Sequence, residues 1–400
     1  MKSPTVVFGM NTMFAVRQFL PEILRAVRQR GMHPVVLAPG NPEDETELAA
    51  QGVELRRVPV KREISLIADV VTLWHLWRQF LAIRPEIANM STPKMAFLGG
   101  LAGWGSCVPH RIYTLRGLRY ETTRGLKRWL LIACERIACA CAHQVLCISR
   151  SVRDRAIEEG VVPVQKTVIL GERASEGLSS RRVGRGGIDS AVLREELGID
   201  ASAKVIGFVG RLTRDKGIEE LAGAFRHLRG QGRNVHLILV GTFEEGDPVD
   251  AATMAWMRGR HDVHCVGYRA NPAPYFELLD VFVFPTYREG LPTVLLEAAA
   301  AGKPVVSTRT TGVIDIVVEE ITGLLVAPGD SAALAGAVAR ILDDDALAKR
   351  MGANAKRLVA EQFDNSVFLN RLGDMLWNLA EQCNGTGSTK GFATQSRSLP

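Results

Sequence analysis

Residues 282–307 read FVFPTYREGLPTVLLEAAAAGKPVVS, and this stretch decides the fold. The run Asp280–Phe284 is too short for a helix and is rich in β-branched and aromatic residues, so it predicts a strand that the next residue, a proline, ends. A helix should follow, with Pro292 in its first turn and Gly302 just beyond its end. A second buried strand should open at residues 304–306. The stretch therefore predicts the order strand, loop, helix, strand.

Two glutamates in this stretch are candidates for ligand binding. Glu289 lies on the loop at the carboxyl end of the first strand, and Glu297 lies about one turn inside the helix. Ligands of open α/β sheets bind at that edge. Glutamates near a helix start also complement the helix dipole, so the spacing alone fits a structural role as well.

Strands and helices alternate through the rest of the chain, which predicts an α/β fold with parallel sheets. The predicted strands are 5–9, 34–38, 52–58, 86–89, 111–115, 144–148, 168–170, 204–210, 235–241, 263–267 and 323–326. The predicted helices are 14–30, 64–83, 95–103, 124–142, 151–160, 218–230, 274–279, 331–342, 346–361 and 363–379. Four hundred residues exceed one core and fit two domains.

Composition changes along the chain set the expected domain boundaries. We expect a first domain at 1–170, a linker and entry segment rich in Gly, Ser and Arg at 171–203, and a second domain at 204–362. A helix at 363–380 is expected to return to the first domain, and the polar segment 381–400 to be disordered.

Charge is distributed unevenly between the two halves. Residues 1–180 carry 24 Lys and Arg against 16 Asp and Glu, whereas residues 181–400 carry 25 against 27. The basic half could face anionic lipid, nucleic acid or phosphorylated substrates. Nucleic acid is disfavoured, because that half lacks interleaved aromatic residues and a recognisable binding module.

Cysteine usage and hydrophobicity bear on the compartment. The chain has seven cysteines, four of them between residues 134 and 147, with no C-x-x-C pair, which predicts free buried thiols in a reducing compartment. Residues 1–16 do not read as a signal peptide, and no apolar run approaches the roughly 20 residues of a membrane span. Trp74 and Trp77 share a helix face, for which we expect core packing rather than membrane anchoring. The chain is expected in the cytosol or at most on a membrane.

A second candidate for ligand binding follows the strand 204–210. The turn that leads into the next helix places Arg211 and Lys216 beside the helix N-terminus. Two cations with free backbone N–H groups suit a diphosphate, although a solvated basic loop has the same composition.

Together the two motifs resemble those of glycosyltransferase family 4. The resemblance is carried by residues 210–217 (GRLTRDKG) and 289–298 (EGLPTVLLEA), and it extends over 204–330. It implies retaining enzymes with the GT-B fold, in which two Rossmann-like parallel-sheet domains face each other across a cleft.

The amino-terminal half resembles one branch of that family, which builds bacterial lipid-linked, capsular and exopolysaccharide glycans. The segments that carry this likeness are 91–94, 111–114, 125–128 and 135–136. The resemblance implies that Ser91, Thr92 and Lys94 lie on the acceptor side.

The resemblance also implies roles for the charged residues. Arg211 and Lys216 would hold the donor's diphosphate and neutralise the departing nucleotide. No D-x-D metal clamp is expected in the sequence, so these fixed cations would do the work of a divalent metal. Glu297 would bind the ribose hydroxyls, and Glu289 the hydroxyls of the transferred sugar. The two carboxylates would therefore recognise hydroxyls rather than act as a glycosidase acid/base pair.

Backbone groups would complete the donor site. Gly290 and Leu291 would present N–H groups near the phosphates, the base would stack near Gly267 and Tyr268, and Gly241 would lie on the donor side. In many members of the family a histidine reaches the donor sugar where this chain has Arg116. An arginine cannot serve as a base at neutral pH, so Arg116 would act in the catalytic group as a hydrogen-bond donor or face an anionic group.

The sequence therefore predicts a retaining glycosyltransferase that moves a hexose or N-acetylhexosamine from a nucleoside-diphosphate sugar, with UDP favoured over GDP. The expected acceptor is a glycan on a polyprenyl diphosphate lipid, met by a cytoplasmic enzyme peripheral to the inner face of the cell membrane. The basic segment Arg119–Trp129 is expected to dock on anionic lipid. The alternatives are a UDP-sugar 2-epimerase of the same fold and a non-catalytic nucleotide-sugar-binding protein.

Overall fold

The structure, a computed structural model, describes residues 3–61, 65–178, 190–383 and 385. Its residues form two compact units. The first comprises Met1–Thr114, Ile137–Gln144 and Leu369–Pro400, and the second comprises Leu115–Arg136 and Val145–Phe368. Residues 115–136 and 145–170 thus group with the carboxyl-terminal half, and residues 369–383 group with the amino-terminal half. Part of the expected linker and most of the expected tail fall outside the described residues.

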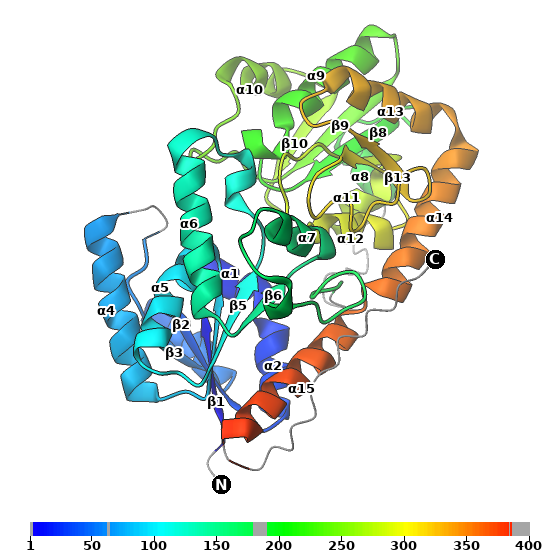
Figure 1. Cartoon of the computed structure of the whole chain (residues 1–400). Coiled ribbons are helices and arrows are strands. Elements are labelled where there is room, and N and C mark those ends of the chain that lie inside the picture. Colours follow the sequence, from blue (N-terminus) through cyan, green and yellow to red (C-terminus); the bar gives the residue numbers. More distant parts are fainter. Residues whose placement is uncertain (1–2, 62–64, 179–189, 384, 386–400) are drawn as a thin grey trace. The chain divides into compact units, whose positions relative to one another are not determined.

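The first unit is built on parallel strands in the order β3-β2-β1-β4-β5 (Figure 1). Their bounds are β1 Thr5–Gly9, β2 His33–Ala38, β3 Glu54–Arg57, β4 Ile87–Ser91 and β5 His110–Leu115. The chain proceeds outward from β1 to β3 and then returns to the other side of β1 with β4. The order therefore reverses between β1 and β4, where a doubly wound sheet opens a crevice at the carboxyl ends of its strands.

The helices of this part are α1 Met13–Phe19, α2 Pro21–Gln29, α3 Pro42–Ala50, α4 Leu66–Ile83 and α5 Pro93–Gly105. The prediction of one helix over 14–30 was wrong, because Pro21 starts a new helix: it lacks the N–H that a continuous helix would need there. Helix α3 was not predicted, although its capping box is visible in the sequence: Asn41 and Asp44 exchange hydrogen bonds of 2.8 Å.

The part of the chain that follows β5 alternates in the same way. Its elements are η1 Arg119–Thr122, α6 Gly125–Cys141, β6 Gln144–Cys147, α7 Arg150–Glu158, η2 Val164–Lys166 and β7 Thr167–Val168. β6 and β7 pair in parallel, with Val145 opposite Thr167. Ser149 is the N-cap residue of α7, since its side chain accepts the N–H of Val152.

The second unit has a six-stranded parallel sheet in the order β10-β9-β8-β11-β12-β13. Its strands are β8 Lys204–Val209, β9 Val235–Val240, β10 Val263–Gly267, β11 Val281–Phe284, β12 Val305–Thr308 and β13 Gly323–Val326. Its helices are α8 Ser190–Glu196, η3 Arg214–Lys216, α9 Ile218–Gly230, α10 Ala251–Arg258, α11 Ala273–Leu278, α12 Thr293–Ala300, α13 Ser331–Asp343 and α14 Asp345–Gln362; α15 Asn365–Cys383 follows. The predicted βαβ unit at 280–306 is confirmed as β11-α12-β12.

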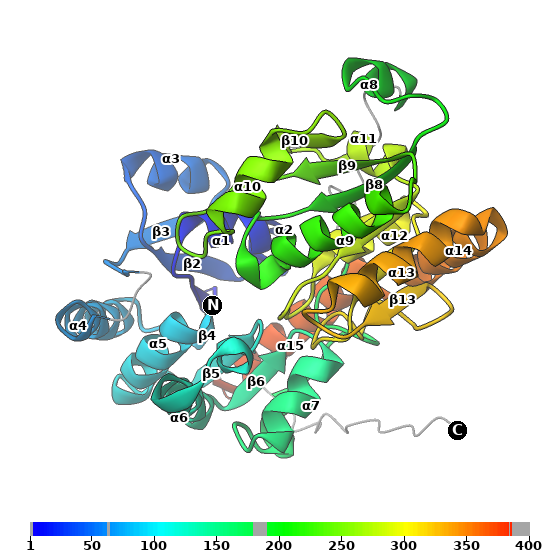
Figure 2. The same ribbon diagram turned by 90° about the horizontal axis from the view of Figure 1, so that it is seen from above.

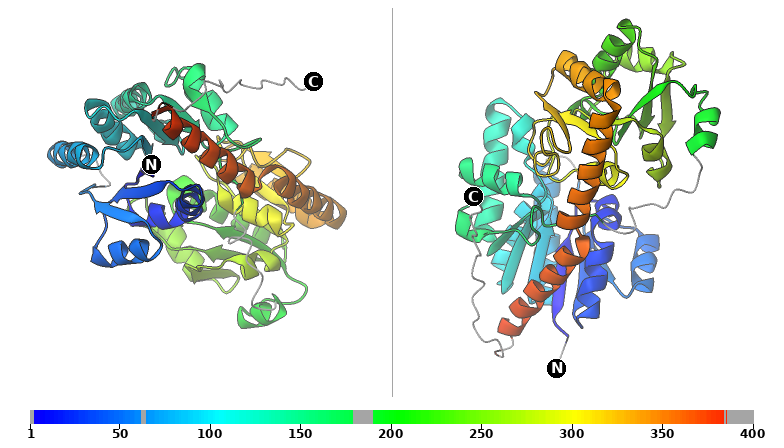
Figure 3. Two further views of the ribbon diagram at one scale, coloured as in Figure 1. Left: turned by 90° about the horizontal axis from the view of Figure 1, so that it is seen from below. Right: turned by 90° about the vertical axis from the view of Figure 1, so that its right-hand side faces the viewer.

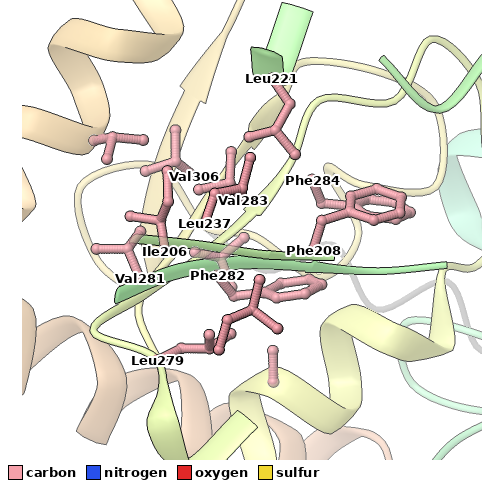
Figure 4. Packing of buried hydrophobic residues seen from close by; sticks show 14 of the residues in the cluster. Ile206, Phe208, Leu221, Leu237, Leu279, Val281, Phe282, Val283, Phe284 and Val306 are labelled. Atoms are coloured by element: carbon pink, nitrogen blue, oxygen red, sulfur yellow. The ribbon is translucent and has the colours of Figure 1, made fainter. Parts of the chain in front are cut away.

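Helices cover both faces of this sheet, which explains why its strands are almost wholly apolar. α9 and α13 lie side by side (Figure 2), and α14, orange in the right-hand view of Figure 3, packs on α12. In the core, the ring of Phe284 stacks on Phe208 at a centroid distance of 5.5 Å and on Phe282 at 6.0 Å (Figure 4). This packing fixes the end of β11, from which the loop with Glu289 departs.

Helix α4 departs from the expectation of core packing. Trp74 is 48% exposed and Trp77 is 40% exposed, so these side chains are not core residues. Among the described residues, α4 is the one helix with the length and apolar composition of a membrane-crossing helix, and 17% of it is buried. The helix is apolar on nearly all sides, so its periodicity could not indicate which side the protein covers.

All seven cysteines carry free thiols, but only Cys139 and Cys147 are buried. Burial raises the pKa of the Cys147 thiol to about 12, which keeps it protonated and unreactive. The prediction of buried thiols therefore holds for these two and was wrong for Cys107, Cys265 and Cys383, which are exposed.

Candidate active site

The second sheet reverses its strand order between β8 and β11. The chain builds β8, β9 and β10 outward in one direction and then returns to place β11 against β8, with Val281 opposite Ile206. The loops after β8 and β11 therefore leave neighbouring strands at the same edge. This is where a doubly wound sheet binds its ligand, and both candidate motifs lie on these two loops.

Lys216 and Glu289 form an ion pair at this edge. The two side chains are 13% and 12% exposed, and the hydroxyl of Thr286 donates a 2.9 Å hydrogen bond to Glu289 Oε1. Lys216 Nζ also lies 5.8 Å from the centroid of the Phe284 ring, within cation–π range. The structure thus brings together Lys216 and Glu289, for which the sequence predicted catalytic roles, although they are 73 residues apart in the chain.

The two loops approach each other closely because of Gly217. Its φ of +71° suits glycine, and a Cβ at this position would lie 2.0 Å from the carbonyl oxygen of Pro285. The N–H of Tyr287 donates to the carbonyl oxygen of Asp215 at 2.9 Å, which ties the loops together. Glycine at 217 is therefore required for the Lys216–Glu289 contact.

Arg211 belongs to a cluster of charges around Asp215. It forms an ion pair of 2.9 Å with Glu244 and lies 3.7 Å from Asp215, which in turn lies 3.6 Å from Arg288. Burial alone would raise the pKa of Asp215, but Lys216, the Thr213 hydroxyl and the two arginines outweigh it, and its pKa is lowered. Asp215 is therefore ionised and holds the cations in place.

Sequence reasoning missed Arg288, although it directly precedes Glu289. Its side chain is 23% exposed, and its Nε is buried without a hydrogen-bond partner in the part of the chain that the structure describes. A buried, unpaired guanidinium nitrogen beside Lys216 and Arg211 is suited to an anionic ligand. The signal was present in the sequence as a third cation at the same strand end.

Gly290 lies against the backbone of Arg116. A Cβ at Gly290 would lie 1.8 Å from the Arg116 carbonyl oxygen, and the Ser149 hydroxyl donates to the Gly290 carbonyl oxygen at 2.9 Å. Arg116 itself forms an ion pair of 2.7 Å with Glu176, and both side chains are nearly buried. The structure therefore places the backbone of Arg116 against the Glu289–Gly290 loop, with Glu176 and Ser149 as further neighbours.

Loop 310–315 completes the surroundings of Gly290. Asp315 accepts the N–H of Ser151 at 3.0 Å and its hydroxyl proton, and the same hydroxyl accepts the N–H of Gly312 at 2.7 Å. Burial raises the pKa of Asp315, against these hydrogen bonds. These contacts fix the loops around Gly290 by hydrogen bonds rather than by apolar packing.

The remaining donor residues occupy strand and helix ends of the same sheet. Glu297 is half-buried in the second turn of α12; Pro292 is the N-cap residue of this helix, one position before the first turn where it was expected. Leu291 is partly buried on the core side of that loop. The N–H of Gly241 donates to the carbonyl oxygen of Gly267 at 2.9 Å, and the neighbouring Tyr268 is 66% exposed.

The residues predicted to lie on the acceptor side belong to the first unit and lie at its own switch point. Ser91 ends β4 and is buried, and Thr92 follows with φ 71° and ψ 143°, a conformation that residues other than glycine rarely adopt. Lys94 forms an ion pair of 2.6 Å with Asp69 and donates to the Lys61 carbonyl oxygen at 2.8 Å. Strained backbone conformations of this kind cluster at functional sites, which is consistent with the role predicted for Thr92.

Across residues 3–61, 65–178 and 190–383, no group of three or more His, Cys, Asp or Glu side chains is arranged to hold a metal ion. The expectation that the sequence has no D-x-D spacing, the pattern of a metal clamp, was wrong, because one occurs at Asp343–Asp345. Asp343 accepts from Arg233 at 2.8 Å, Asp344 caps α14, and Asp345 accepts from Lys204 at 3.0 Å. These carboxylates already serve the junction of α13 and α14.

Two family models of glycosyltransferases match this chain. Residues 189–358 match the family model for glycosyl transferases group 1, and residues 15–171 match the model for a glycosyl transferase 4-like domain. The chain is 33% identical to the capsular polysaccharide biosynthesis glycosyltransferase CapM of Staphylococcus aureus over 344 residues, which cover 86% of this chain and 90% of that protein.

A second relative is the UDP-Gal:alpha-D-GlcNAc-diphosphoundecaprenol alpha-1,3-galactosyltransferase of Escherichia coli, 23% identical over 78% of this chain and 81% of that one. Among solved structures, Anabaena HepE in complex with UDP-glucose superposes with a TM-score of 0.76 at 20% identity, covering 93% of this chain and 99% of that one. This structural likeness confirms the predicted GT-B fold.

Proposed function

The chain belongs to the glycosyl transferases group 1, and from this membership we propose that it moves a hexose or N-acetylhexosamine from UDP to a lipid-linked glycan acceptor with retention of configuration. Three lines of support are the UDP-glucose bound to HepE, the diphosphoundecaprenol acceptor in the name of the E. coli relative, and the capsular role in the name of CapM. The proposed setting is surface polysaccharide synthesis at the cytoplasmic face of a membrane.

The observation that carries the proposal is the Lys216–Glu289 ion pair at the β8/β11 switch point. A diphosphate that entered between Lys216, Arg211 and Arg288 would compete with Glu289 for the lysine. Glu289 would then be free to accept hydrogen bonds from sugar hydroxyls, while the Thr286 hydroxyl keeps it oriented. Closing the site around the donor would strengthen these interactions by excluding water.

The other donor contacts follow from the strand ends. Glu297 would bind the ribose hydroxyls, and the N–H groups of Gly290 and Leu291 would lie near the phosphates. The exposed ring of Tyr268, beside Gly267, would stack on the base, and Gly241 would leave room for it. Arg116, held by Glu176, would donate hydrogen bonds to the transferred sugar or to an anionic acceptor group.

We further propose that turnover needs no divalent metal, since fixed cations would neutralise the departing nucleotide. The test is the rate of UDP release in EDTA, with and without added magnesium or manganese. Equal rates are expected. Loss of activity in EDTA that either metal restores would overturn the cation model.

Activity itself is tested with a panel of UDP- and GDP-sugars against a polyprenyl-diphosphate glycan. Thermal shift identifies the donor, because a ligand that binds the folded state raises its stability. UDP release should require the acceptor, and the anomeric coupling constant of the product should match that of the donor. Sugar interconversion without acceptor would indicate a 2-epimerase, and binding without turnover would indicate a sensor.

Docking on anionic lipid through Arg119–Trp129 is also part of the proposal. Leu126 is 85% exposed and Trp129 is 62% exposed, and Arg124 and Lys127 are exposed beside them. Arg128, in the same segment, does not contribute, because it forms an ion pair of 2.7 Å with Glu159 and its charge is already neutralised. Aromatic and basic side chains together suit the headgroup region of a bilayer.

A further inference from the structure

Helix α4 exposes an apolar face that the first unit does not cover. Large side chains on this face are 40–83% exposed; they are Leu66, Ile67, Val70, Trp74, Trp77 and Leu81. Scattered exposed apolar residues are ordinary on soluble proteins, but six on one helix form a contiguous surface that marks an interaction site. α4 lies on the outer side of α5 (Figures 1 and 2), which leaves this face open.

The opposite face of α4 anchors the helix to the protein. Thr72, Leu76 and Phe80 are buried, the Thr72 hydroxyl donates to the carbonyl oxygen of Pro59 outside the helix, and Asp69 pairs with Lys94 of α5 at 2.6 Å. Strand β3 precedes α4 and β4 follows it, both in the same sheet. A helix held on one face and at both ends cannot cross a bilayer without unfolding the unit, so it would lie in the plane of a surface.

The charges around this face are complementary to an anionic surface. Within α4, Asp69 is neutralised by Lys94, and Arg78 is exposed with its guanidinium carbon 4.7 Å from the centroid of the Trp74 ring. Exposed Lys61 precedes the helix and exposed Arg84 ends it. An apolar face flanked by cations that can reach the headgroups is typical of a helix lying in a bilayer interface.

The apolar surface continues onto α5. Trp104 is 65% exposed, and a Cβ at the neighbouring Gly105 would lie 3.9 Å from Trp77 Cδ1. Tryptophan prefers the boundary between hydrocarbon and headgroups. A second copy of the chain fits less well, because a two-fold contact would place the same cations opposite each other, whereas anionic lipid supplies the opposite charge.

From this geometry we infer that α4, with Trp104, inserts its apolar face into an anionic membrane surface and anchors the enzyme in the plane of the bilayer. The inference rests on the proposed function, in which a lipid-linked acceptor is met at that surface. It adds an apolar contribution to membrane binding, which is distinct from the electrostatic contribution of Arg124 and Lys127. Because salt does not screen apolar burial, this contribution should persist at high salt.

The test compares two triple variants of the full chain in sedimentation with vesicles of phosphatidylglycerol and phosphatidylcholine, at low and high salt. One carries Ile67→Ser, Val70→Ser and Leu81→Ser on α4. The control carries Val164→Ser, Val192→Ser and Ile321→Ser, which replace apolar side chains elsewhere that are 47–54% exposed. The α4 variant should partition at least about tenfold more weakly at both salt concentrations, and the control should match the parent chain.

Three outcomes would overturn the inference. Equal losses in both variants would indicate general surface hydrophobicity, and unchanged binding of the α4 variant would show that α4 stays out of the lipid. Conversion of a dimer to a monomer in the α4 variant, seen by sedimentation velocity, would show that a second copy covers the face. Donor-dependent thermal shift, measured on the same variants, reports the proposed function separately: it should persist in both.

Discussion

Helices α4 and α12 are both apolar, but they differ in how far their large side chains are buried. α12 connects β11 to β12, and Leu295 and Leu296 on it are wholly buried between the sheet and α14. α4 connects β3 to β4 and leaves Leu66 and Ile67 more than four-fifths exposed. The comparison shows that apolar composition alone does not decide burial: α12 packs its leucines against both the sheet and α14, whereas α4 packs on α5 and leaves most of its large side chains exposed.

The largest expected difference between the two helices is in stability. Leu296→Ala on α12 leaves a cavity in a closed core and should reduce the free energy of unfolding by about 2–5 kcal/mol. Val70→Ala on α4, where the side chain is 66% exposed, should change it by no more than about 0.5 kcal/mol. Denaturant unfolding in the absence of lipid measures both. A comparable loss at Val70 would mean that its face is covered in solution.

The next effect concerns the carboxylates that α12 and its preceding loop position. Glu297→Ala should mainly weaken donor binding and Glu289→Ala should mainly lower turnover, because a hydrogen bond to a charged group contributes roughly 1.5–3 kcal/mol. Each parameter should change about 10- to 150-fold. Exposed Glu245 provides the control, since Glu245→Ala removes a charge near the same edge without touching the Lys216 pair. Full turnover in Glu289→Ala would contradict the assigned role.

Much of the region around α12 could be predicted from the sequence, because its signals are local. The predicted strand at 280–284 is β11 at Val281–Phe284, and the Gly302 stop lies one residue beyond the C-cap of α12. Lys216 and Glu289 could be assigned to one site from the sequence alone, since both follow strands of a parallel sheet. Local motifs and the ends of strands can be located from residue spacing alone.

What the sequence could not show depends on contacts between distant loops. Asp215 gathers Arg211 and Arg288, and Ser149 reaches Gly290 across 141 residues, and no spacing rule connects such positions. The exposure of Trp74 was missed for a related reason: a helix that is apolar on nearly all sides has no periodicity that tells covered from uncovered faces.

A smaller effect is expected for the basic residues at the start of α6. Replacing Arg124 and Lys127 with Ser should weaken binding to anionic vesicles by up to about 2 kcal/mol at low salt, and the loss should shrink at high salt. Arg128→Ser is the matched control: it removes the ion pair with Glu159, so it should affect stability more than lipid binding. Unlike the α4 variants, these should respond to salt. Vesicle binding that changes with neither the lipid charge nor the salt concentration would show that the excess of basic residues has another role.

The smallest expected effect is a change in the pH dependence of stability at Glu121, which accepts a 2.6 Å hydrogen bond from Thr311 in the hydrogen-bonded region near Gly290. Burial raises the pKa of Glu121, against the lowering effects of that bond, Arg155 and Arg288. A raised pKa means that the folded state favours the protonated carboxyl, so its contribution is fully present below the unfolded pKa and is lost as pH rises through the folded pKa. Glu121→Gln keeps an oxygen for Thr311 but cannot ionise, so the variant should gain stability relative to the parent chain as pH rises from 4.5 through that range. Thermal unfolding across this pH range measures the difference, with the 67% exposed Glu158→Gln as the control for net charge. A difference that is the same at every pH would show that burial of Glu121 does not affect its ionisation.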